Sequence, residues 1–364
     1  MITVNISDLH FGAMEPQRQY EYLKTQCIDK VCTVPFDVFC IQGDIFDRKF
    51  MANNDAIMYA SLFIRDALNL CNQKDALLLI ISGTSTHDAN QLKLFYHLMN
   101  EDNHINIVET VQFVQWKQYR ILCIPELYGL PEDVYAQALY NSGVYDMAIL
   151  HGTVKNSIYG YNEATLTSEK HPVFDISHFY NCRGPIMCGH VHVSNCLQKH
   201  IYYTGSPYRW QFGEEAEKGF MVCILDDITN RYFVHFEPIH CDLYNTYNLD
   251  NKLNLSADDL VNYIKSLRLN PDDHIKIKFT QESNIIPIIK DYFRNNPKYV
   301  IDAEDLRYKC SIKAVEQEND YFNKFVFLDD SSLSSEEKLV MVINILEGKD
   351  VITVQELTDM MSTM

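Results

Sequence analysis

Residues 37–48 read DVFCIQGDIFDR, an apolar run that is followed at once by a glycine and two aspartates. The run 37–42 has the length and the β-branched and aromatic content of a buried strand. Gly43 lets the backbone turn sharply where the strand ends. Asp44 and Asp47 therefore lie at the end of a predicted sheet, which is where open α/β sheets bind their ligands.

Four other apolar runs end in the same way. The segments that follow them are Asp8-Leu9-His10, Gly83-Thr84-Ser85-Thr86-His87-Asp88, His151-Gly152 and Gly189-His190-Val191-His192. Carboxylate oxygens and imidazole nitrogens bind Mn, Fe and Zn, and alternate residues that leave a strand can converge on one ion. Two ions about 3.5–4 Å apart can hold the attacking and leaving oxygens of a displacement at phosphorus. One such segment is weak evidence, but five in succession predict a metal site.

Strand-like and helix-like segments alternate over the first 240 residues. Helices are expected at 16–34, 53–71 and 90–99. Strands are expected at 4–7, 37–42, 76–82, 112–116, 119–124, 146–150, 185–188, 201–204, 219–225 and 231–238. The alternation predicts an α/β fold that becomes rich in strands towards residue 240.

A polar stretch, residues 242–254, predicts a domain boundary. Beyond it, helices are expected at 256–267 and 285–293 and strands at 274–279 and 308–314, which together predict a small α+β unit. Residues 329–335 have the composition of a linker.

Two short helices are expected after this linker. Each begins with a capping box, Ser334 with Glu337 and Thr353 with Glu356. Apolar side chains recur at helical spacing in both helices: Leu339, Val342, Ile343 and Leu346, then Val354, Leu357 and Met361. Such stripes are typical either of a small local core or of a helical pair that docks on a partner.

The composition is that of an ordinary globular protein, with 47% apolar and 22% charged residues. Apolar runs such as 76–81 are far too short to span a bilayer, and the N-terminus lacks the pattern of a cleaved leader. The eleven cysteines are scattered and form no Cys-x-x-Cys pair. We therefore expect a soluble, unprocessed protein of the cytoplasm, where thiols stay reduced.

The formal net charge of −18 argues against a protein that binds DNA unaided. The charge is unevenly distributed, with −12 over residues 1–250, +2 over 251–313 and −8 over 314–364. Bound divalent metal would neutralise part of the acidic excess. The charge favours a partner that supplies affinity for DNA.

The five segments, in this order, resemble the calcineurin-like metallophosphoesterase superfamily. Residues 205–214, GSPYRWQFGE, and the later Lys218-Gly219-Phe220 resemble the SbcD-type double-strand-break repair nucleases in particular. The resemblance covers residues 2–240 well and 250–315 in outline. It implies a metallophosphoesterase β-sandwich flanked by helices at 1–241, a small α+β capping domain that binds DNA at 250–315, and a helical partner-binding tail at 331–364.

The resemblance also implies roles for individual residues. The first metal ion would be held by Asp8, His10, Asp44 and His192. Asp44 would bridge to a second ion, held also by His151 and His190. The preferred ion is expected to be Mn, with Mg, Fe and Zn as alternatives.

Around these ligands, His87 would be the catalytic histidine, with Asp88 orienting its ring. Asp47 would line the phosphate side, although a plain helix-capping role is equally compatible with its position. Arg48, Lys49 and Arg209 are candidates for contact with DNA phosphates, and ordinary solvated surface charge is the alternative for each.

The chain departs from this family at residues 83–88. The family reads Gly-Asn-His-Asp, and its Asn is a ligand of the second metal. Here the segment is two residues longer and contains no Asn. Thr86 stands directly before His87 and is the expected replacement, with water or a rearranged loop as alternatives. We therefore expect the second ion to bind more weakly than the first.

These expectations amount to a hydrolase that cuts DNA phosphodiesters as an exonuclease and endonuclease, in DNA repair, recombination or replication. The implied partners are DNA, an SbcC-type coiled-coil ATPase and a second copy of the chain in a heterotetramer. Two alternatives stay open. One is a phosphatase or cyclic-nucleotide phosphodiesterase on the same core, and the other is a catalytically weakened scaffold subunit of the ATPase complex.

Overall fold

The computed structural model describes residues 1–88, 90–127, 143–155, 173–197, 200–226, 228–229 and 231–303. The chain divides into two compact units. The first comprises Met1–Thr246, Ile264–Lys276 and Lys298–Val300, and the second comprises the intervening segments and the C-terminal remainder. In the described part of the chain, no helix combines the length and the apolar character that crossing a membrane requires.

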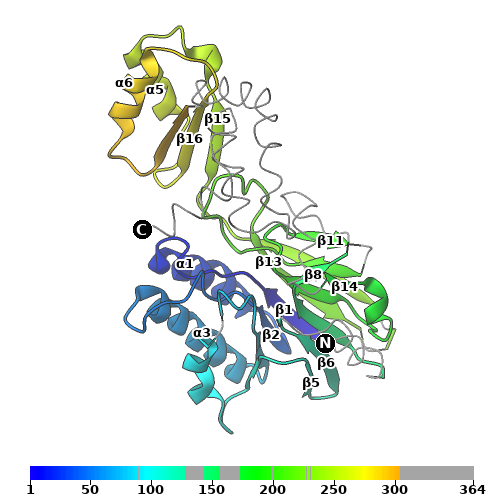
Figure 1. The fold of residues 1–364 in the computed structure, drawn as a ribbon. Helices are drawn as coiled ribbons and strands as arrows, with labels where there is room; N and C mark the ends of the chain where they lie inside the picture. The colour runs from blue at the N-terminus through cyan, green and yellow to red at the C-terminus, as the bar shows by residue number, and fades with distance from the viewer. Residues whose placement is uncertain are drawn as a thin grey trace, which may run out of the picture. The chain divides into compact units, whose positions relative to one another are not determined.

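The first sheet has six strands in the order β14-β13-β1-β2-β3-β4 (Figure 1). Their bounds are Ile2–Ile6 for β1, Val38–Gln42 for β2, Leu77–Ile81 for β3, Ile105–Val108 for β4, Gly219–Leu225 for β13 and Tyr232–Pro238 for β14. Strands β1 to β4 are parallel, and β13 and β14 add an antiparallel edge. Every residue of β2 and β3 is buried, as is typical of parallel strands covered on both faces.

The second sheet also has six strands, in the order β11-β12-β10-β7-β6-β5. Their bounds are Gln112–Trp116 for β5, Tyr119–Ile124 for β6, Met147–His151 for β7, Ile186–Gly189 for β10, Asn195–Leu197 for β11 and Ile201–Tyr203 for β12. Strands β6, β7, β10 and β12 are parallel, and β5 and β11 are antiparallel edges. A separate pair, β8 (Thr153–Val154) and β9 (Val173–Phe174), follows β7.

The two sheets pack face to face. One apolar cluster joins alternate residues of both, among them Cys40 and Leu79 from the first sheet and Ile121, Ile149 and Met187 from the second. Because successive side chains of a strand point to opposite faces, the other residues of the same strands face outwards. The outward-facing residues of the first sheet pack against the helices and form a second apolar cluster. The outward-facing residues of the second sheet pack against the loops after β7 and form a third cluster. The predicted α/β class is confirmed, in the form of a two-sheet sandwich.

Helices cover the outer face of the first sheet (Figure 1). The helix predicted at 16–34 is divided into α1 (Pro16–Leu23), a π-helical turn (Lys24–Ile28) and α2 (Asp29–Val31). The long helix α3 spans Asp55–Gln73. The helix predicted at 90–99 is instead a 3₁₀-helix, Leu92–Leu98, the form that short connecting segments commonly take.

A three-stranded sheet, in the order β15-β16-β17, follows further along the chain. Its strands are Tyr244–Asn248, His274–Phe279 and Tyr299–Ala303, and the helices α5 (Ala257–Ser266) and α6 (Ile285–Phe293) connect them. Strand β15 lies within 242–254, the stretch that was predicted to be a domain boundary. The strand itself was not predicted, because its exposed positions are polar and hide the strand pattern. The predicted strand 308–314 and the tail 331–364 lie outside the described residues.

The start of α3 gives a test of this fold. The Asn54 side chain accepts a hydrogen bond from the Ala56 N–H at 2.8 Å and so satisfies an otherwise unpaired donor of the first turn. We expect Asn54→Ala to lower the free energy of unfolding by about 0.5–2 kcal/mol, measured by urea denaturation. Asn54→Asp should retain the cap and most of the stability, and equal losses in both variants would contradict the assignment.

Candidate metal centre

The predicted ligands follow parallel strands of both sheets. Asp8 and Asp44 follow β1 and β2, His151 is the last residue of β7, and His190 follows β10. The carboxyl ends of parallel strands lie at the same edge of a sheet, and the sandwich brings the two such edges together. Side chains that are more than 180 residues apart in the sequence therefore lie side by side, as Asp8 and His192 do.

The backbone at these positions is strained. Asp8, His10, Asp44 and His190 have φ values of 53°, 43°, 51° and 86°, in the left-handed region that non-glycine residues rarely occupy. They are four of the seven non-glycine residues with positive φ in the described ranges, so the strain is concentrated here. Strain of this kind persists where the surrounding structure holds it, and it is characteristic of functional sites.

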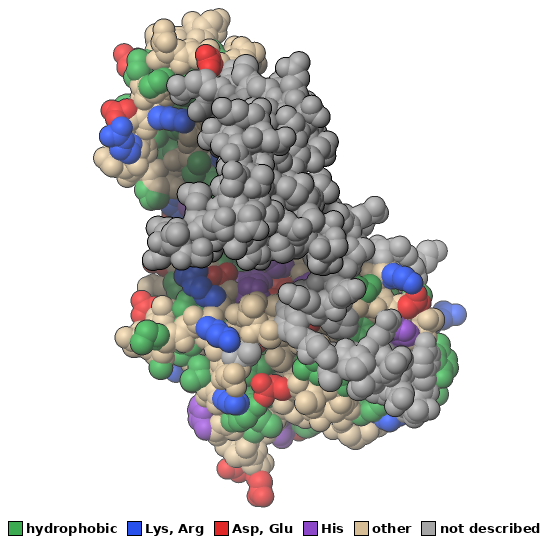
Figure 2. Space-filling view, in the orientation of Figure 1, with side chains coloured by type: hydrophobic (Ala, Val, Ile, Leu, Met, Phe, Trp, Pro, Cys, Tyr) green, Lys and Arg blue, Asp and Glu red, His purple; other side chains and the backbone are tan. Residues whose placement is uncertain are grey.

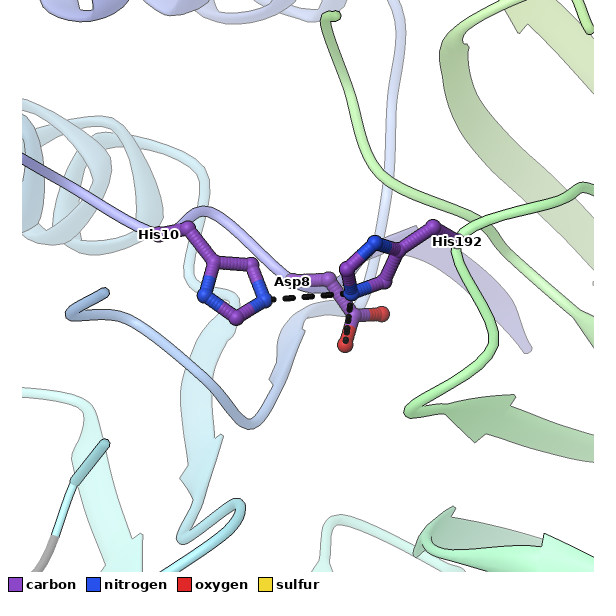
Figure 3. Close-up of side chains that lie close together, drawn as sticks. All are labelled: Asp8, His10 and His192. Carbon is purple, nitrogen blue, oxygen red and sulfur yellow. Dashed lines mark hydrogen bonds and ion pairs between the residues drawn. The ribbon is translucent and has the colours of Figure 1, made fainter. Parts of the chain in front are cut away.

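The first ligand group consists of Asp8, His10 and His192 (Figure 3). The Nε2 atoms of the two imidazoles are 3.2 Å apart, and His192 Nε2 is 4.0 Å from Asp8 Oδ1. Asp8 also accepts hydrogen bonds from the Ser7 hydroxyl and from the His190 N–H, which fix its carboxylate. Two ring nitrogens and a carboxylate oxygen thus lie close enough together to bind one divalent cation.

The second ligand group consists of Asp44, His151 and His190. His151 is fully buried, and its Nδ1 donates a hydrogen bond to the Gln42 carbonyl at 2.6 Å. The proton therefore belongs to Nδ1, and Nε2 is directed at Asp44 Oδ2, 3.4 Å away. The same Oδ2 atom is 3.7 Å from His10 Nε2, so Asp44 lies between the two groups.

Charge and burial act together on these groups. Burial alone would raise the pKa of Asp44, but the neighbouring His151 and His10 hold it well below its usual range. Burial would lower the pKa of His151, yet Asp44 keeps it well above the ordinary value. Burial lowers the pKa of His10 to about 4, because it outweighs the attraction of Asp44. Asp44 is therefore ionised at neutral pH, and a metal ion bound beside it would replace a proton on Nε2 of His151, while Nδ1 keeps its proton.

His87 lies next to both groups. One of its ring nitrogens is close enough to His10 and Asp44 to share an ion with them, and its ring is 4.8 Å from that of His10. Its Nδ1 is hydrogen-bonded to the Asp47 carbonyl, which acts as the acceptor. Asp88 was expected to orient this ring, but its carboxylate instead accepts bonds from the backbone N–H groups of Ile45, Phe46 and Gly83. It ties the loop after β2 to the loop after β3, and burial raises its pKa to about 7.

Thr84, and not Thr86, lies beside the second group. The side chain of Thr86 is exposed, whereas Thr84 is buried and donates its N–H to Asp44 Oδ1 at 2.6 Å. Glu126, which was not among the predicted site residues, is also buried here, 3.2 Å from His190 Nδ1. The signal that could have revealed Glu126 is its position two residues after the apolar strand β6.

The three residues predicted to contact DNA phosphates differ in their exposure and in their bonding partners. Arg48 and Lys49 are exposed, and Arg48 forms an ion pair with Asp47 at 3.3 Å. The guanidinium of Arg209 instead donates to the carbonyls of Glu214 and Ala216 at 2.8 and 2.7 Å. Arg209 therefore holds its own loop in place, and the structure gives it a role in the fold.

Gly43 offers a test of how the site is built. It has a φ of +85°, and a Cβ on it would lie 2.3 Å from His151 Nδ1. We expect Gly43→Ala to displace His151 and to weaken Mn²⁺ binding, measured by titration calorimetry. Gly143→Ala is the matched control, since Gly143 also has a positive φ but its Cβ would come no closer than 3.6 Å to the other residues that the structure describes. It should lose stability through backbone strain alone, and equal Mn²⁺ affinities in the two variants would contradict this account.

No protein-family model matches the chain. A curated relative named "Putative phosphoesterase 244L", from Invertebrate iridescent virus 6, is 24% identical over 229 residues, which are 61% of this chain and 75% of the relative. The cold-active protein-tyrosine phosphatase of a psychrophilic Shewanella aligns with 66% of this chain and 80% of its own, at 14% identity and a TM-score of 0.30. Another solved structure covers 65% of this chain and 98% of its own, at 12% identity and a TM-score of 0.40.

Proposed function

We propose that the chain is a hydrolase that cuts phosphoesters with the help of two bound divalent metal ions. The observation that carries this proposal is the position of Asp44, whose Oδ2 lies within 3.7 Å of His10 and 3.4 Å of His151, between the two ligand groups. We assign the first ion to Asp8, His10, Asp44 and His192, and the second to Asp44, His151 and His190. The relative that is named a phosphoesterase supports the same reaction class.

The chain itself would contribute the negative charge of Asp44 and, in His87, a general acid or base. Bound ions of this kind neutralise phosphate charge and lower the pKa of an attacking water. The Asp44 carboxylate would lower the repulsion between two neighbouring cations, because it lies between their ligands. The bond from His87 Nδ1 to the Asp47 carbonyl places the ring proton on Nδ1. His87 Nε2 is then the atom that would take up a proton from the attacking water and give it to the leaving oxygen.

We further propose that the substrate is a phosphodiester of DNA and that Mn²⁺ is the working ion. Arg48 and Lys49 are exposed directly after Asp47, where cations can bind phosphates on either side of the cut bond. Figure 2 shows histidine and acidic side chains reaching the surface close to Lys and Arg side chains. The segment 205–220, which resembles the SbcD-type nucleases, adjoins the first ligand group, since the Trp210 ring is 5.0 Å from that of His10.

A partner belongs to the same proposal. The net charge of −18 disfavours DNA binding by this chain alone. We propose that two copies of the chain assemble with an SbcC-type coiled-coil ATPase, that the unit around α5 and α6 acts as a DNA-binding cap, and that the tail 331–364 docks on the ATPase. The apolar stripes of that tail are the sequence feature that supports this role.

The Asp44→Ala variant tests the reaction class. Without the shared carboxylate, two cations would repel each other, so we expect Mn²⁺-dependent cleavage of linear and hairpin DNA to be lost. Asp102→Ala, which removes an exposed aspartate in the turn before β4, should cleave at the parental rate. Cleavage by Asp44→Ala close to the parental rate would contradict the proposal. Hydrolysis of p-nitrophenyl phosphate without cleavage of DNA would instead identify a phosphatase.

The His87→Ala variant tests the proton carrier. We expect Mn²⁺ and DNA binding to persist while turnover falls by about 10²–10⁴-fold, the usual contribution of a general acid or base. His97→Ala removes an exposed histidine of the nearby 3₁₀-helix and should leave turnover unchanged. Loss of bound Mn²⁺ in His87→Ala would show that His87 is a ligand and not a proton carrier.

A further inference from the structure

Glu126 is a buried carboxylate beside the second ligand group, and neither ion assignment above includes it. It follows β6, a strand of the second sheet, and only 3% of its surface is exposed. Its Oε2 atom is 3.2 Å from His190 Nδ1 and 3.6 Å from His151 Nε2. These two imidazoles are the same ones that, with Asp44, form the second group.

Thr84 links the two carboxylates. Its hydroxyl is 3.0 Å from Glu126 Oε2, 3.3 Å from Asp44 Oδ2 and 3.5 Å from His151 Nε2. A hydroxyl has one proton to donate, and donating it to Glu126 at the shorter distance fixes the direction of that carboxylate. This hydrogen bond therefore holds Glu126 with its Oε2 atom close to the ring nitrogens of His151 and His190.

Glu126 and Asp44 are two buried carboxylates that both lie beside His151 Nε2. Two carboxylates that share a buried site repel each other, and taking each one out of water is costly. A divalent cation between them and the imidazoles of His151 and His190 would compensate both carboxylates at once.

We propose that Glu126 is a protein ligand of the second metal ion and that Thr84 positions its carboxylate. This inference rests on the two-ion function proposed above and adds a fourth ligand to the second set. Each ion would then have two carboxylates and two imidazoles, with Asp44 shared. The second site is therefore as highly charged as the first, and the two ions should bind with comparable affinity, contrary to the expectation from the missing Asn.

Mn²⁺ binding to the full chain, measured without substrate, tests this inference. Metal-free protein is titrated by calorimetry, and the signal of a magnetically coupled Mn²⁺ pair is followed by electron paramagnetic resonance. We expect two Mn²⁺ ions in the parent protein. In Glu126→Gln, which keeps the size of the side chain, we expect one ion to bind as before, the other to bind about 10–100-fold more weakly, and the pair signal to disappear.

Glu214→Gln is the matched control. Glu214 Oε1 lies 3.5 Å from Nδ1 of His192, so this change also removes a carboxylate charge beside an imidazole, but at the first group. The second ion and the pair signal at saturating Mn²⁺ should persist in Glu214→Gln. If Glu126→Gln binds both ions with parental affinity, or if the parent protein binds a single ion, the inference is wrong.

A second variant covers the case in which Glu126→Gln does not fold, which circular dichroism would show. Thr84→Val keeps the shape of the side chain and removes its hydroxyl, and it should weaken the second ion, whereas Thr84→Ser should not. Equal second-ion affinity in the Val and Ser variants would overturn the inference.

The two proposals fail in different ways. A parent protein that binds two Mn²⁺ ions through Glu126 but cuts no phosphoester contradicts the proposed function and supports this inference. A protein that cuts phosphoesters and keeps both ions in Glu126→Gln supports the function and overturns the inference.

Discussion

The buried carboxylate of Asp44 is the constraint on which the site depends. It is 3% exposed at the end of β2, with an N–H of Thr84 on one oxygen and imidazoles on either side of the other. A carboxylate removed from water is stable only where hydrogen bonds and positive charge replace the lost solvation. The surrounding chain must therefore approach it closely. A Cβ on Gly83 would lie 2.2 Å from Asp44 Oδ1, so only glycine fits there.

The two-sheet sandwich makes this approach possible. Its central apolar cluster fixes one sheet against the other, and the parallel strands of both sheets end beside the site. Within the second sheet, the register of β7 and β10 places Gly189 next to His151, and a Cβ at Gly189 would lie 2.8 Å from the His151 ring. The packing of the core thus also sets the positions of the candidate ligands.

The strained backbone is held by bonds between the loops. The N–H of Asp8 donates to the Gly43 carbonyl at 3.1 Å, and the N–H of His10 donates to the Asp44 carbonyl at 2.9 Å. The loops after β1 and β2 therefore fix each other in the left-handed conformations that each would avoid alone. The large buried core supplies the stability against which this strain is maintained. Side chains held in this way are preorganised, so those that could hold a cation would not have to move far to meet one.

The sequence by itself determined the long buried strands and the Asp and His residues that end them. Apolar runs carry that information locally, and the bounds of β5, β6 and β13 agree with the predicted 112–116, 119–124 and 219–225. Strand β15 was missed because its exposed residues are polar, and the 3₁₀-helix was read as an α-helix because both have a similar apolar spacing. Only the tertiary structure decided that Thr84 and not Thr86 reaches Asp44, and that Glu126 joins His151 and His190. Sequence spacing does not encode how a loop turns or how two sheets pack, and these set the distances between side chains from different strands.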